Sequence, residues 1–122
     1  MTQAYRNCLA LLLSIACAGP AAAHPALTDS EPKAGAVITA SPRAVSLHFN
    51  EALIAKFSGL VIKNTDGQTL EIATATTTSN DAKQLIIALK TPLPPGAYTV
   101  EWHAVSVDTH RVKGSYSFTV AP

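Results

Sequence analysis

Residues 96–105 read G-A-Y-T-V-E-W-H-A-V, and this stretch decides the fold class. Tyr98, Val100 and Trp102 alternate with the polar residues Thr99 and Glu101. Successive side chains of an extended strand point to opposite faces, so apolar residues at every second position predict a strand with one face in a core. We therefore expect a β-strand here, with Trp102 in the core.

The same alternation recurs on both sides of this stretch. Residues 44–50 place Val45, Leu47 and Phe49 on one face, and the pattern returns near the end of the chain at 116–120. Residues 85–89 form a continuous apolar run, which predicts a strand buried on both faces. Turn-forming Gly, Pro, Asn and Asp residues separate these runs at short intervals.

The pattern predicts one all-β domain with no helix of normal length. One helical turn is expected within residues 51–57. Short strands at this spacing, about seven with an eighth near the end, in roughly a hundred residues, favour an immunoglobulin-like β-sandwich. The expected strands are 26–30, 36–39, 44–50, 59–64, 69–76, 84–89, 97–105 and 112–120.

The start of the chain predicts a signal peptide at residues 1–23. A polar stretch containing Arg6 precedes an apolar run at 8–18, and Gly19-Pro20 and three alanines follow. These are the n-, h- and c-regions of a secretory signal, and the apolar run is too short to span a bilayer as an anchor. Cleavage after Ala23 would leave an exported domain of residues 24–122.

A competing interpretation is lipidation at Cys17. Residues 13–17 loosely resemble a lipoprotein box, with Ser14 where leucine is usual. Lipidation would make Cys17 the first residue and would place His24 inside the chain.

Composition excludes several classes of function. Both cysteines and the single methionine lie within residues 1–23, so the expected mature chain has no thiolate or thioether ligand. A formal net charge of +1 gives no electrostatic case for nucleic acid or anionic membrane as a partner. The sequence contains neither a G-x-S-x-G nucleophile motif nor a glycine-rich phosphate loop, so we expect no enzyme.

Metal binding is a stronger hypothesis. Asp108 and His110 form a D-x-H triplet, and in extended backbone residues i and i+2 point to the same side. If cleavage makes His24 the first residue, its α-amine and ring can chelate one ion. Pro25 lacks an N–H, so the chelate is confined to these two nitrogens. With one nitrogen of His110 and one oxygen of Asp108, this N3O set suits Cu(II).

The other candidate residues have weaker claims. Glu51 follows a predicted strand and is expected either as an axial or second-sphere oxygen or as a solvated carboxylate. His48 and His103 lie on the polar faces of their strands and are expected at the surface rather than at the metal.

With these residues in place, the sequence resembles the CopC family of periplasmic copper-binding proteins. The matching stretches run in order through residues 24–122, and no one of them is specific alone. They are H-P-A-L at 24–27, P-K-A-G at 32–35, L-H-F-N-E-A-L at 47–53, G-A-Y-T-V-E-W-H-A-V-S-V-D-T-H at 96–110 and G-S-Y-S-F-T-V at 114–120.

The resemblance implies a Greek-key sandwich with a Cu(II) site at the residues that match His24, Asp108 and His110, with a glutamate at Glu51 near the metal in some members. It further implies a monomeric carrier or buffer in copper resistance or uptake, with a CopD-type membrane protein as partner. The methionine-rich Cu(I) loop of one branch is absent from residues 63–78. Arginine is common in the family where this chain has His103.

Two other functions stay open on the sequence. An amino-terminal histidine with a second histidine also resembles the histidine brace of oxidative copper enzymes. A sandwich module for adhesion or assembly, with incidental histidines, is the third possibility.

Overall fold

The fold is an all-β sandwich, seen in a computed structural model that describes residues 24–72, 74, 76–78 and 81–122. The predicted signal peptide and the Cys17 lipidation motif lie outside the described residues. Within the described part no helix is long and apolar enough to cross a bilayer. It holds eight strands and one 3-10 turn: β1 (Leu27–Glu31), β2 (Val37–Ile38), β3 (Ala44–Phe49), η1 (Ala55–Phe57), β4 (Gly59–Lys63), β5 (Thr76–Thr78), β6 (Asp81–Ala88), β7 (Gly96–Val105) and β8 (Arg111–Val120).

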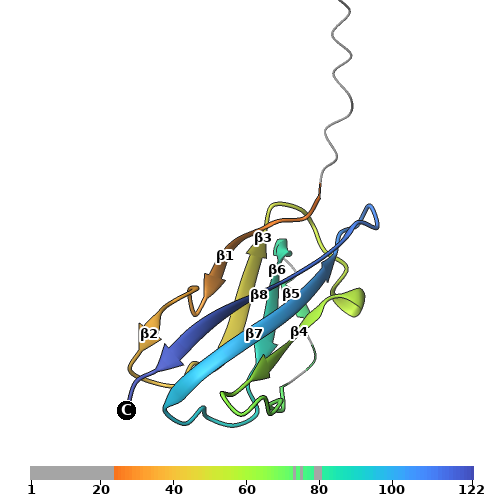
Figure 1. Ribbon diagram of the computed structural model, residues 1–122. Helices are drawn as coiled ribbons and strands as arrows, with labels where there is room; N and C mark the ends of the chain where they lie inside the picture. Colours follow the sequence, from red (N-terminus) through yellow and green to blue (C-terminus); the bar gives the residue numbers. More distant parts are fainter. Residues whose placement is uncertain (1–23, 73, 75, 79–80) are drawn as a thin grey trace, which may run out of the picture.

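The strands form two four-stranded sheets that face each other (Figure 1). One sheet has the order β1-β3-β6-β5 and the other the order β2-β8-β7-β4. Strand β2 pairs in parallel with β8, and the other pairs of neighbouring strands are antiparallel. The order of each sheet matches that of immunoglobulin-type sandwiches. The predicted fold class is confirmed, and η1 supplies the single turn expected within residues 51–57.

The core lies between the sheets and is built from the alternating positions. Val45, Leu47 and Val100 are fully buried, as the alternation predicts. Tyr98 stacks on Phe118 at 5.7 Å between ring centroids. The remaining buried apolar residues are Phe49, Leu53, Leu60, Ile62, Leu85, Ile87, Leu93, Ala104, Val105 and Val120.

Trp102 lies at the edge of this core rather than within it. Its ring is half-buried and meets Phe49 edge to face at 5.3 Å. The ring also covers Gly114, its cross-strand partner on β8. The prediction placed Trp102 on the correct face of its strand, the one that packs against the core, but it was wrong that the side chain is fully buried.

Two strand predictions need correction. Residues 85–89 are not buried on both faces: Leu85 and Ile87 are fully buried, but Ala88 is exposed, because the second face of β6 is turned away from the opposite sheet. Among the described residues of the strand expected at 69–76, Thr69 and Ile72 form isolated bridges, and β5 begins at Thr76.

Candidate metal centre

The turn between β7 and β8 carries Asp108 and His110. The N–H of Ser106 donates to the carbonyl of His110 at 2.9 Å, and the N–H of Thr109 donates to the carbonyl of Ser106 at 2.9 Å. Thr109 has a φ of 71°, in the left-handed region. The expectation of extended backbone here is therefore wrong. A tight turn, not a strand, brings the carboxylate and the imidazole together.

The Asp108 carboxylate is held from two sides. Its Oδ1 accepts a short hydrogen bond from the hydroxyl of Ser106, which is fully buried. Its Oδ2 lies 3.2 Å from Nδ1 of His110. The hydrogen bond from Ser106, and then the nearby His110, lower the pKa of Asp108. The carboxylate is thus kept ionised and oriented, as a metal ligand must be.

Among the residues that the structure describes, none forms a hydrogen bond with the Nδ1 of His110. Nδ1 is shielded from solvent, and its contact with Asp108 lacks hydrogen-bond geometry. Two ligand atoms about 2.0 Å from one ion and at right angles to each other are separated by about 2.8 Å. The 3.2 Å between Nδ1 of His110 and Oδ2 of Asp108 is close to that spacing. This pair therefore fits neighbouring ligands of one ion.

His24 lies beside His110, although the two residues are near opposite ends of the chain. Their ring centroids are 5.1 Å apart and the ring planes meet at 67°. Two imidazoles bound to one ion have centroids about 4.4 Å apart when cis and about 6 Å apart when trans. The observed separation falls within this range, so the spacing of the two rings is compatible with a shared ion.

Asn50 holds the start of the described chain in place. Its side-chain Oδ1 accepts from the N–H of Ala26 at 2.7 Å, and its own N–H donates to the carbonyl of Ala26 at 3.1 Å. Pro25, between Ala26 and His24, is buried. Figure 1 shows the start of the domain, the segment after β3 and the β7–β8 turn at one end of the sandwich.

Asn50 and Ser106 are the two site residues that the sequence analysis missed. Asn50 is the last residue of the strand predicted at 44–50, and Ser106 directly follows the strand predicted at 97–105. Both are polar residues at a point where the chain must turn, and this is the one signal that could have found them. Many surface residues share that signal, so it would not have been specific.

Glu51 lies next to the centre, but its side chain makes no described contact with the other candidates. It is half-buried and stands between Asn50, which binds Ala26, and Ala52, whose carbonyl accepts from the N–H of Val107 at 3.0 Å. Its backbone is thus fixed between the two halves of the centre.

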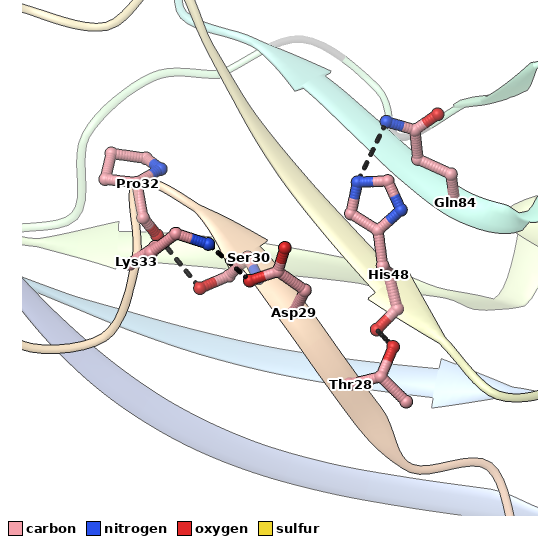
Figure 2. A network of polar contacts seen from close by, with 7 residues as sticks. All are labelled: Thr28, Asp29, Ser30, Pro32, Lys33, His48 and Gln84. Carbon is pink, nitrogen blue, oxygen red and sulfur yellow. Dashed lines mark hydrogen bonds and ion pairs between the residues drawn. The ribbon is translucent and has the colours of Figure 1, made fainter.

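His48 belongs to a different polar network (Figure 2). Its Nε2 lies 3.3 Å from Nε2 of Gln84, and its carbonyl accepts from the Thr28 hydroxyl at 3.1 Å. Asp29 faces it across β1 and β3 and pairs with Lys33 at 2.9 Å, which lowers the pKa of Asp29.

His103 also stands apart from the centre. It is exposed, and its ring lies beside Gly59 on the neighbouring strand.

The centre is assembled from pairwise contacts. Within the residues that the structure describes, no three His, Cys, Asp or Glu side chains yet converge tightly enough to enclose an ion. His110 is shared by two contacts, one with Asp108 and one with His24. His24 is exposed, so its side chain has room to change its rotamer.

Comparison with known proteins identifies the family. The CopC domain model matches residues 27–121. Protein YobA of Escherichia coli K12 is 40% identical over 118 residues, which cover 97% of this chain and 95% of the relative. Copper resistance protein C of Escherichia coli is 40% identical over 106 residues, covering 82% and 83%.

Solved structures agree with this match. The crystal structure of CopC from Methylosinus trichosporium OB3b superimposes with a TM-score of 0.76 at 30% identity, covering 81% of this chain and 95% of that one. The protein therefore belongs to the CopC family.

Proposed function

We propose that the protein is a periplasmic Cu(II)-binding carrier or buffer in copper resistance or uptake. The observation that carries the proposal is the meeting of His24 with the Asp108–His110 pair at one end of the sandwich. Family membership supports it, since relatives of similar length are named copper resistance proteins.

The proposed ligands are His24, Asp108 and His110. Removal of residues 1–23 would free the α-amine of His24 and add a second nitrogen from that residue. The resulting N3O set, with no sulfur in residues 24–122, favours Cu(II) over Cu(I). We place Glu51 as an axial or second-sphere oxygen, because its neighbours on both sides are bonded to the segments that carry the ligands.

We further propose that a CopD-type membrane protein exchanges copper with this carrier, which acts as a monomer. The exposure of His24 and of the β7–β8 turn supports exchange, because a partner can reach the ligands without unfolding the sandwich.

The position of Asp108 argues against an oxidative histidine-brace enzyme. A carboxylate 3.2 Å from the His110 ring nitrogen would occupy a position that oxygen chemistry needs open. Reductant-dependent peroxide production by the copper-loaded protein would overturn this argument.

The direct test is to export the full chain, measure the intact mass with and without Cu(II), and record the electron paramagnetic resonance spectrum. We expect cleavage after Ala23, one copper per chain and nitrogen hyperfine coupling. His110→Ala should lower the affinity at least about a hundred-fold, whereas His48→Ala, a histidine held in another network, should leave it unchanged. Equal losses in both variants, or no nitrogen coupling in the wild type, would refute the proposal.

A form that retains Ala23 tests the role of the amine. It keeps the His24 ring but blocks its α-nitrogen, so it should bind Cu(II) much more weakly than the cleaved protein. Glu51→Gln should change the spectrum more than the affinity, because an axial ligand contributes little to binding.

A further inference from the structure

A groove of about 330 Å³ opens directly beside the β7–β8 turn, which carries the proposed ligands Asp108 and His110 and is called the metal-bearing turn below. Val105 and Arg111 are the cross-strand pair that closes the β7–β8 hairpin, and both line the groove. His103 and Lys113, the pair two positions further from the turn, line it as well. The groove therefore begins at the last paired residues of the hairpin, immediately before the turn that carries Asp108 and His110.

The groove combines an apolar wall with unpaired cations. Val105 is buried in its floor, and Phe57 of η1 forms a wall with 52% of its surface exposed. Arg111 and Lys113 are exposed and join no ion pair within the described residues, and the groove lining contains no carboxylate. By contrast, Lys33 and Lys63 are each paired with a carboxylate on the surface.

The aromatic wall is held in place by the backbone. The N–H of Ile54 donates to the carbonyl of Val105 at 2.8 Å, and the N–H of Val105 donates to the hydroxyl of Ser58 at 3.0 Å. These bonds tie both ends of η1 to β7. Phe57 is thus presented from a fixed turn, which reduces the entropy lost when a partner docks. A fixed exposed aromatic residue and an arginine are typical of interface hot spots.

We propose that this groove docks a protein segment that carries carboxylates next to an apolar side chain. The apolar side chain packs against Phe57, and the carboxylates pair with Arg111 and Lys113. Because the groove adjoins the metal-bearing turn, the segment belongs to the protein that exchanges metal with this one; this identification of the partner rests on the proposed function.

A protein segment fits better than an anionic membrane. The groove is concave and the formal net charge of the chain is only +1, whereas binding to a lipid surface calls for a cluster of several basic residues. A recess of this size has room for one or two side chains.

The test is a nuclear magnetic resonance titration of the metal-free, 15N-labelled mature protein at low salt. The probe is a short peptide, blocked at both ends, in which acidic residues flank a leucine–phenylalanine pair. We expect the amide shifts to be confined to residues 57, 103–105 and 111–113, with a dissociation constant on the order of a millimolar. Added salt should weaken the binding, because it screens exposed charges.

Matched variants separate docking from general charge. Arg111→Glu/Lys113→Glu should weaken binding at least about five-fold. Lys83→Glu/Lys90→Glu makes the same change of charge at exposed positions on and just after β6, in the other sheet, and should leave binding unchanged. Phe57→Ala, also at an exposed position, should weaken binding about three-fold through loss of apolar contact. Unperturbed amides elsewhere show that each variant is folded.

Four outcomes would overturn the proposal. The first is the absence of amide shifts at the groove, and the second is equal binding of a peptide with lysines in place of the acidic residues. The third is a change of the groove shifts when the protein is diluted without peptide, which would indicate that a second copy of the chain occupies the groove. The fourth is broadening of the groove resonances by anionic vesicles alone. Since the titration contains no copper, its failure would leave the copper site untouched. Conversely, the absence of nitrogen hyperfine coupling in the copper-treated wild type would refute the proposed function and would leave this result standing.

Discussion

Replacing Ser106 by alanine removes the hydrogen bond that its hydroxyl donates to the Asp108 carboxylate. Ser106 is fully buried and its hydroxyl donates to Oδ1, which leaves Oδ2 facing His110. Without this bond the carboxylate can rotate away from the imidazole. We expect the affinity for Cu(II) to fall about 10- to 100-fold, as for other groups that orient a metal ligand, which corresponds to about 1.4–2.7 kcal/mol.

The same substitution should affect folding much less. Asp108 is 48% exposed, so water can replace part of the lost hydrogen bond. A hydrogen bond to a charged group stabilises the fold less when solvent can screen that charge, as it can at Asp108. The variant should therefore lose more free energy of copper binding than free energy of unfolding.

The assay is a competition titration with a chelator of known Cu(II) affinity, paired with urea unfolding of the metal-free protein. Ser115→Ala removes an exposed hydroxyl from β8 and serves as the control. If Ser106→Ala binds copper within about two-fold of the wild type, or if Ser115→Ala loses as much affinity, the idea that Ser106 positions the ligand is wrong.

Three further predictions concern other parts of the sandwich. Asn50→Ala should lower Cu(II) affinity several-fold by freeing the exposed Ala26 N–H, but should cost at most about 1 kcal/mol in stability, as checked by the same titration and urea unfolding. Gly114→Ala should destabilise the fold by about 1–3 kcal/mol and shift the tryptophan fluorescence, because the new Cβ would lie 2.5 Å from the Trp102 ring; unchanged unfolding would contradict the packing described. Burial raises the pKa of Tyr116 to about 12, so this tyrosine ionises at a lower pH in the unfolded chain than in the folded protein. The free energy of unfolding should therefore fall between about pH 10 and 12, by about 2 kcal/mol after allowance for solvent screening. Tyr116→Phe should flatten that dependence in urea unfolding measured across this range, and an equally steep loss in the variant would assign it to other groups.

The fold class could be predicted because the signal is local. Val45, Leu47 and Phe49, like Tyr98 and Val100, alternate along one strand, and that alternation is set by the geometry of extended backbone. The depth of each side chain could not be predicted in the same way. Trp102 and Ala88 are more exposed than the hydrophobic patterns of their strands predicted. The burial of a side chain depends on which residues of other segments pack against it, and the pattern of its own strand does not specify them.

The centre shows the same division. The sequence by itself determined which metal-binding side chain types are present, with no sulfur ligand after residue 23, and it predicted His24, Asp108 and His110 as the ligands. Only the tertiary structure decided that they meet. The left-handed turn at Thr109, the hydrogen bond from Ser106 and the attachment of Ala26 to Asn50 bring distant segments together. Contacts between segments far apart in sequence depend on sheet order and on the path of the backbone, and no local pattern of residues specifies either.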